Sequence, residues 1–450
     1  MPNYTRISAE FELVTPAFIG GANKDKAGCI DPKAVKAALR HWWRVLNWPR
    51  IQKTEPDTRC ALACLHQAEM RLFGFASSKT HGGQGLLQVT VQHKSGLKQW
   101  TAPMQNLPAG MIYLFGQGLY ESENRKQNKP ARMLRTAIDT GTFSVTLILH
   151  CPRLGFVPEQ DETQIIEALK AFGLLGNLGS RQNRGFGSVR MTRLAQQDFA
   201  KDEADYTAAL RGLFPLSSPP LSLLPSLCTQ ARMRLLVPDE TGQIRLLARN
   251  SQSNEPRPTQ SYSKPVSTPW QILSCIGEEF LIERSSGYGM GNGERRTLGG
   301  FTAQCFYEAD HRWISTAKRE GNKLSKLPRH ERKNAVTLVA NPDQTPPPVR
   351  MIYGLPYGFD KGKEISVKLT DKLDGRRASP LHIHITRLGE QTAAVLYTLP
   401  SAFLPEGASV HIKLCSVGEY CPDIPVSRLK FDYAVIDDFL NRFTSAKKLL

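Results

Sequence analysis

A glycine- and arginine-rich segment offers the clearest chemistry in this sequence. It reads GLLGNLGSRQNRGFGSVR and covers residues 173–190. Glycines permit positive φ and close approach of another backbone, and consecutive exposed amides can bind phosphate oxygens. Arg181 and Arg184 add planar guanidinium donors for phosphate, and Phe186 can stack on an RNA base. The segment therefore predicts an RNA-binding loop, Gly176–Gly187, although a purely structural tight turn would explain the same residues.

The same segment departs from the two common phosphate-binding motifs. A P-loop ends in Gly-Lys-Ser/Thr, and this ending is missing from the loop. A dinucleotide-binding turn follows a strand and begins a helix, whereas this loop follows an expected helix and precedes an expected strand. We expect no cofactor.

A helix expected from Asp31 to about Asn47 carries an apolar stripe and a basic stripe. The apolar stripe consists of Val35, Leu39, Trp42 and Leu46. The basic stripe consists of Lys33, Lys36, Arg40 and Arg44. Trp43 lies beside the basic stripe, so this face could bind phosphates while a base stacks on the indole ring. A solvated basic face without a ligand is the alternative.

Two features precede this helix. The segment TPAFIGGA, residues 15–22, places Gly20 and Gly21 after an expected strand, where they would admit a ligand backbone or form a plain turn. Asp31 can cap the first free amides of the helix, with Pro32 in the first helical position. Asp31 could also be catalytic, but capping already explains it.

Other candidate metal and acid–base residues are weaker. Cys60 and Cys64 lie four residues apart near His66, but no second pair completes a tetrahedral zinc site, so we expect buried core thiols and no metal. His382 and His384 share one face of an expected strand. They could form an acid–base pair for RNA cleavage or be half-buried strand residues.

The composition points to a polyanionic partner. The 450 residues contain 58 Lys and Arg against 41 Asp and Glu, a formal net charge of +17 that both halves of the chain share. No apolar run is long enough to cross a membrane, and the first residues do not resemble a signal peptide. Nine scattered cysteines favour free thiols in the cytoplasm over a disulfide framework.

The expected elements predict an α+β fold of two ferredoxin-like domains, each an antiparallel sheet with helices on one face, plus insertions. The first half alternates as strand, helix, two strands, helix and strand, with an additional helix over 58–73. The expected domains are 1–214 and a divergent copy, 231–450, joined by a Pro- and Ser-rich linker, 215–230. The second domain should contain a hairpin at 380–398, a terminal helix at 434–448 and a mobile basic insertion near 311–350.

These motifs together resemble a known family. LVTPAFIGGA, VKAALRHWWRVL and GLLGNLGSRQNRGFGSVR are similar to segments of RAMP-superfamily CRISPR proteins. More narrowly, they resemble the first Cmr subunit of type III-B effector complexes. The later segments YGLPYGF and RRASPLHIHI also fit this resemblance.

The resemblance implies an RRM-like RAMP fold and a non-catalytic, RNA-binding subunit in antiviral defence. Its expected partners are guide RNA, complementary target RNA and other Cmr subunits, with no membrane. The expected RNA-binding residues are Gly20, Gly21, Lys36, Arg40, Trp43, Arg44, Arg181, Asn183, Arg184 and Phe186. The chain departs from the family pattern in its length, notably near 311–350.

Two other classes of function stay open at this point. A metal-independent endoribonuclease that processes guide RNA would use Asp31 or the His382 and His384 pair. A scaffold at a membrane surface or between proteins would use the charge but would not need the arginine–aromatic loop.

Overall fold

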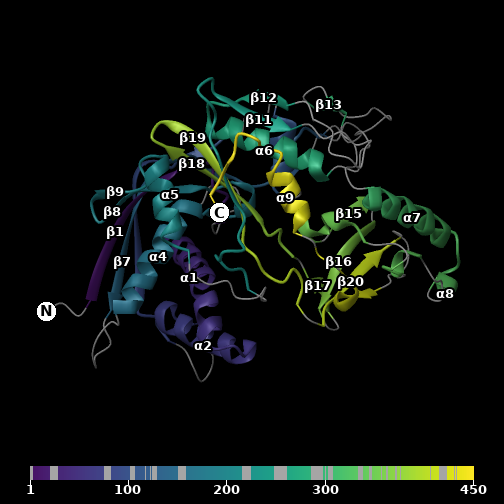
Figure 1. Cartoon of the computed structure of the whole chain (residues 1–450), viewed down its shortest axis with the longest axis horizontal. Helices are drawn as coiled ribbons and strands as arrows, with labels where there is room; N and C mark the ends of the chain where they lie inside the picture. The colour runs from purple at the N-terminus through teal and green to yellow at the C-terminus, as the bar shows by residue number, and fades with distance from the viewer. Residues whose placement is uncertain are drawn as a thin grey trace.

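The structure combines helices with antiparallel sheets (Figure 1), which confirms the predicted α+β class. It is a computed structural model, and it describes residues 4–20, 29–75, 83–101, 107–116, 118–121, 123, 129–150, 159–214, 224–247, 261–284, 297–298, 301–302, 308–332, 338–343, 347–355, 357–360, 363–369, 372–375, 377–405, 407–414, 423–429, 431 and 433–449. Gly21 lies outside these ranges, as does the first part of the expected linker, 215–223.

The first unit has the strand order of a ferredoxin-like fold. Its sheet runs β2-β7-β1-β8-β9, with all neighbours antiparallel. The strands are β1 (Tyr4–Leu13), β2 (Leu87–Gly96), β7 (Gly141–His150), β8 (Val189–Leu194) and β9 (Gln197–Asp198). Buried and exposed residues alternate along β1 and β7, so the sheet buries one face. The helices are α1 (Pro32–Thr54), α2 (Thr58–Phe73), α4 (Glu159–Leu175) and α5 (Glu203–Arg211).

Helix α1 begins where the sequence predicts and continues beyond its expected end. The Asp31 carboxylate accepts a hydrogen bond from the Ala34 amide at 2.7 Å, which confirms its capping role. We expected the helix to stop before Pro49, but it continues through this residue to Thr54. Proline leaves the carbonyl of Val45 without its helical donor. The amide of Leu227 supplies a donor instead, at 3.1 Å, so the proline is accommodated.

The second sheet repeats the strand order of the first. It runs β18-β19-β10-β22 and is again antiparallel. The strands are β10 (Met233–Leu236), β18 (Leu381–Leu388), β19 (Gln391–Thr398) and β22 (Lys447–Lys448), and the helices are α6 (Pro269–Arg284) and α9 (Ala434–Leu440). The expected terminal helix at 434–448 is thus too long, because the chain leaves α9 at Asn441 and ends by pairing β22 with β10.

The remaining elements are insertions and connections around these two units. Between β2 and β7 lie β3 (Gln99–Trp100), α3 (Ala109–Phe115), β4 (Tyr120–Glu121), β5 (Arg132–Met133) and β6 (Ala137–Ile138). The short helical turn η2 (Gln182–Arg184) precedes β8. Between β10 and β18 lie β11 (Gln243–Leu247), β12 (Ser261–Pro265), β13 (Thr297–Leu298), β14 (Phe301–Thr302), α7 (Glu308–Ser325), α8 (Arg329–Arg332), η3 (Leu338–Ala340), η4 (Val349–Tyr353), β15 (Tyr357–Asp360), β16 (Lys363–Leu369) and β17 (Lys372–Gly375). After β19 come β20 (Ser409–Lys413), β21 (Asp423–Pro425) and η5 (Val426–Arg428).

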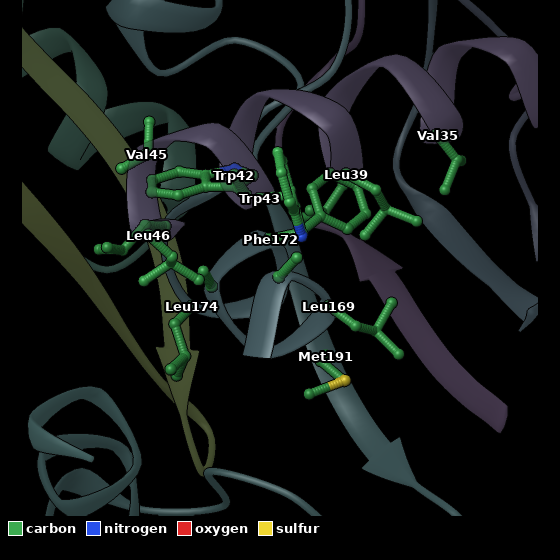
Figure 2. Close-up of a cluster of buried hydrophobic side chains, with 14 of the residues drawn as sticks. Val35, Leu39, Trp42, Trp43, Val45, Leu46, Leu169, Phe172, Leu174 and Met191 are labelled. Atoms are coloured by element: carbon green, nitrogen blue, oxygen red, sulfur yellow. The ribbon is translucent and has the colours of Figure 1, made fainter. Parts of the chain in front are cut away.

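Helices α1 and α4 of the first unit lie between the two sheets. Figure 2 shows α1 and α4 interdigitating through Leu39, Trp43 and Phe172. The same core cluster contains Met233, Leu235, Val395 and Tyr397 from the second sheet. The opposite face of that sheet, including Leu236 and Leu396, packs with α6 and α9. The second sheet is therefore covered on both faces, whereas we expected helices on one face only.

The described part of the expected linker belongs to this packing. Leu227 and Cys228 are buried, and the Ser226 amide donates to the carbonyl of Pro400 at 3.2 Å. This stretch ties α1 to the second unit rather than separating two independent cores. Among the described residues, no helix is long and apolar enough to cross a bilayer.

Candidate nucleic-acid interface

The glycine-rich loop folds back onto the end of β1. The Ser180 amide donates to the carbonyl of Phe18, and the Gly187 amide donates to that of Pro16, both at 2.9 Å. Gly187 has a φ of +68°, and an added Cβ would lie 2.0 Å from the carbonyl oxygen of Leu178. A side chain cannot fit there, so this glycine serves close backbone packing.

The ring of Phe186 is part of the core. It is fully buried, stacks on Phe115 with ring centroids 4.8 Å apart, and meets the edge of Phe18 at 5.5 Å. We expected this ring to stack on an RNA base. That expectation is wrong, because aromatic residues from two other segments already cover it.

The end of the loop packs against the second unit. The Arg184 guanidinium lies 4.4 Å above the centre of the Phe280 ring. The side-chain amide of Asn183 donates to the backbone carbonyl of Ser379 at 3.4 Å. The Ile385 amide of β18 donates to the Ser188 hydroxyl at 3.0 Å. Arg184 and Asn183, both predicted to bind RNA, thus contact the protein's own second unit.

The start of the loop faces outward beside the segment that precedes α1. Phe18 pairs with Ser180 in antiparallel fashion, so exposed Gly20 lies two residues beyond this pair on the Leu178 side, and Arg181 directly follows Ser180. The Arg135 guanidinium reaches the Ser180 hydroxyl at 3.4 Å, and its side chain is exposed. Arg181 is part-exposed and has a left-handed backbone, with a φ of +62°. Gly20, Arg135 and Arg181 each lie next to or within two residues of the Phe18–Ser180 pair or contact it, and we call this surface the loop rim.

Trp43 of α1 points inward. It is 1% exposed, its indole nitrogen donates to the Gln164 side chain at 3.0 Å, and its ring meets Phe73 edge-on. We expected Trp43 to lie on the basic face beside Arg40. That expectation is wrong, because the ring fills the space between α1, α2 and α4.

The basic stripe of α1 is partly neutralised by one buried acid. Arg40 and Arg44 both bind Glu69 of α2, whose side chain is 8% exposed. Arg44 forms two hydrogen bonds with this carboxylate, which raise the pKa of its guanidinium. Arg40 also donates to the carbonyl of Gly74. The two arginines remain part-exposed, at 33% and 45%, so their outer edges can still meet an anion.

Lys36 is also engaged by the fold. Its ammonium donates to the carbonyl of Leu87 at 2.9 Å. Burial, followed by the neighbouring charge of Arg40, lowers the pKa of Lys36. Lys36 thus joins α1 to the start of β2.

Sequence reasoning missed two arginines that flank this stripe. Arg71 binds Asp161 of α4 at 2.5 Å, and Arg50 binds Glu167 at 2.6 Å. Both side chains are part-exposed, at 44% and 35%. Their acidic partners lie far along the chain, so no local spacing signals these pairs.

Of the two histidines proposed for acid–base chemistry, His384 is enclosed and His382 is part-exposed. His384 is fully buried, and its Nδ1 lies 3.1 Å from the Asn177 side-chain oxygen. Burial lowers the pKa of His384 to about 3. His382 stacks on Tyr397, and burial lowers its pKa to about 3 as well. An RNA strand cannot reach His384 in this structure.

The cysteine expectation also needs correction. Cys60 and Cys64 are exposed on α2, whereas we expected buried thiols. The apolar side of this helix is instead occupied by Ala61, Leu65 and Leu72. Within the described ranges, no cluster of three His, Cys, Asp or Glu side chains could hold a metal ion.

The fold and the loop rim define an α+β protein with two ferredoxin-like strand orders and a cationic edge. The family model of the RAMP superfamily matches residues 10–190, which contain the first unit and its glycine-rich loop. This match confirms the resemblance that the sequence motifs indicate.

Comparisons of the whole chain add solved structures but no curated protein, since none of the curated proteins matches. The chain is similar to the crystal structure of Cmr1 from Pyrococcus furiosus in its apo form, at 14% identity and a TM-score of 0.47, covering 99% of this chain and 98% of that one. It is also similar to a chain in the cryo-EM structure of the type III-B Cmr-beta complex bound to cognate target RNA. There the identity is 10% and the TM-score 0.44, with 98% of each chain covered.

Proposed function

We propose that this chain is an RNA-binding, non-catalytic subunit of a type III-B CRISPR (Cmr) ribonucleoprotein effector complex. In this role it helps to hold guide RNA and to capture complementary target RNA, with other Cmr subunits as neighbours. Antiviral defence in the cytoplasm follows from the same proposal.

The proposal is supported by the three N-terminal motifs together with the RAMP match over residues 10–190. The observation that carries the RNA-binding part is the loop rim. Exposed Arg135 and part-exposed Arg181 lie next to Ser180, and exposed Gly20 follows two residues after Phe18, the bridge partner of Ser180. The net charge of +17 favours a polyanion at such a surface.

The geometry also favours a particular mode of binding. The two rings that the sequence predicts to stack on bases, Trp43 and Phe186, are buried. The outward groups are guanidiniums and a glycine, which suit phosphate oxygens rather than base edges. A subunit that holds RNA of many sequences needs this kind of contact.

The test is a double substitution in the loop rim, Arg135→Gln with Arg181→Gln, in the full chain. Affinity for a labelled single-stranded RNA is measured by fluorescence anisotropy over a range of salt concentrations. Losing two phosphate contacts should weaken binding about tenfold near physiological salt and make the salt slope shallower by about 1.4.

The matched control is Lys201→Gln with Arg211→Gln, which removes the same charge from exposed positions in and next to α5. Equal affinities and slopes for the two variants would contradict RNA binding at the loop rim.

Incubating the chain with repeat RNA in EDTA tests the non-catalytic part of the proposal. Specific cleavage that disappears in His382→Ala or Asp31→Ala would overturn it.

A further inference from the structure

Helix α7 is an amphipathic helix inserted between α6 and β18. Its inward face, Trp313, Ile314, Ala317 and Leu324, is buried in the core of the second unit. In Figure 1 the helix lies at the far end of the molecule from β1 and α2. The sequence predicted a mobile basic insertion here, whereas residues 308–325 form a packed helix.

The described acidic side chains of α7 bind the protein itself. Asp310 and Arg350 form an ion pair at 2.5 Å with both side chains fully buried, and Asp310 also accepts from the Val349 amide at 2.7 Å. At the other end, Glu320 accepts from the Leu338 amide at 3.0 Å. These contacts fix α7 to η4 and η3 and turn both carboxylates away from the outer face.

The outer face of α7 is a line of cations. Its exposed basic residues are Arg312, Arg319 and Lys323, and exposed Lys326 follows directly after the end of the helix. They recur at offsets of 7, 11 and 14 from the first, so they lie within a narrow stripe opposite the buried face. The Lys326 amide donates to the Lys323 carbonyl, which continues the turn past the end of α7. At 1.5 Å per residue, the stripe is about 21 Å long.

We propose that this α7 stripe is a second RNA-binding surface, which contacts the phosphates of an RNA strand without reading its sequence. A row of cations on one helix face matches a row of phosphates, and base readout would need aromatic or amide side chains. The stripe itself consists of arginine and lysine, and exposed Ser315 and Asn322 lie beside it. This inference rests on the proposed RNA-binding function, because it adds a second contact to the same ligand.

A membrane surface fits these observations less well. Amphipathic helices that bind bilayers insert their apolar face between lipids, and the apolar face of α7 is buried against the protein. Leu338 on the adjacent η3 is exposed, but one side chain is too little to anchor a bilayer. A surface on an acidic protein remains as an outcome of the test.

The test compares two triple variants and one double variant of the full chain. Each is measured for binding to labelled single-stranded RNA across salt concentrations. The first is Arg319→Gln, Lys323→Gln and Lys326→Gln. The matched control is Lys201→Gln, Arg211→Gln and Lys448→Gln, three exposed residues outside both surfaces. The third is the loop-rim pair, Arg135→Gln with Arg181→Gln. All should keep the circular dichroism spectrum and melting temperature of the unaltered chain.

The α7 variant should bind RNA roughly 10- to 50-fold more weakly than the control near physiological salt, with a slope shallower by about 2. The loss should be the same for RNAs of different sequence. If only the loop-rim variant loses affinity, the α7 proposal is overturned and the proposed function stands. If neither variant differs from the control, both fail. If α7 binds an acidic protein instead of RNA, only the loop-rim variant will lose affinity for RNA.

Discussion

Helix α1 carries four basic residues along one side, and helix α7 carries three with Lys326 just past its end, yet the two helices differ in where the nearby acids lie. On α1, Arg40 and Arg44 converge on Glu69, which is almost fully buried beneath them. On α7, the carboxylates of Asp310 and Glu320 bind η4 and η3 on the protein side. The α1 stripe is therefore half-neutralised and structural, whereas the described carboxylates of α7 bind on the protein side of the helix.

The same contrast holds for the aromatic residues of the motif segments. Trp43 and Phe186 stand in the most recognisable motifs, and both fill the core. Motif residues of the first unit thus maintain its architecture, while cations without a motif supply much of the outward charge. A basic stripe in the sequence therefore predicts a ligand surface only after the positions of the neighbouring carboxylates are known.

The largest expected effect concerns Phe186, a buried residue of the glycine-rich motif. Replacing Phe186 by alanine should lower the free energy of unfolding by about 3–5 kcal/mol, because the substitution opens a cavity between Phe18 and Phe115. Urea unfolding followed by fluorescence measures this loss. Phe186→Leu is the control and should cost much less. A stable Phe186→Ala protein with weakened RNA binding would instead restore the base-stacking role.

A second substitution should make α1 behave more like α7. Glu69→Gln removes the buried counterion of Arg40 and Arg44, which should destabilise the chain by about 1–2 kcal/mol. The two released charges should tighten RNA binding severalfold and steepen the salt slope by up to about 1.4. Anisotropy titrations check this expectation. Unchanged RNA affinity in a folded Glu69→Gln protein would show that the α1 stripe lies away from the RNA.

The last expected effect develops gradually and concerns pH and the buried side of the glycine-rich loop. Burial lowers the pKa of His384 to about 3, against about 6.5 in an unfolded chain, so the unfolded state binds the extra proton below pH 6.5. Stability from this group is fully present above pH 6.5. It should fall by up to about 1.4 kcal/mol per pH unit as the pH decreases toward the folded value.

Melting temperatures between pH 7 and pH 5 measure this slope. His384→Asn keeps a polar group beside Asn177 and cannot titrate, so its slope should be shallower than that of the unaltered chain. Equal slopes would mean that His384 is accessible to protons in the folded state. In that case its role in acid–base chemistry would need to be considered again.

The repeating parts of the fold could be predicted because they follow from local patterns. Short stretches of sequence are enough to predict the alternating burial in β1 and β7 and the Asp31 cap of α1. The strand order of the first sheet follows from the βαββαβ sequence of elements. The second sheet was harder to predict, because one long insertion separates β10 from β18 and another separates β19 from β22.

The orientation of the site residues could not be predicted, because it depends on distant partners. Phe186 is covered by Phe115, and Arg184 lies over Phe280 in another unit. The passage of α1 through Pro49 needs the amide of Leu227. Residue type and spacing gave the candidate residues, and only the assembled core separates those that face solvent from those that face inward.

The most direct test of RNA binding through outward cations is ultraviolet crosslinking of the full chain to labelled RNA, with crosslinked peptides mapped by mass spectrometry. We expect crosslinks in peptides that contain Arg135, Ser180 and Arg181, and in peptides from α7. Trp43 and Phe186 should remain free of crosslinks. Crosslinks concentrated on these two rings, or absent from both the loop rim and the α7 stripe, would contradict the account.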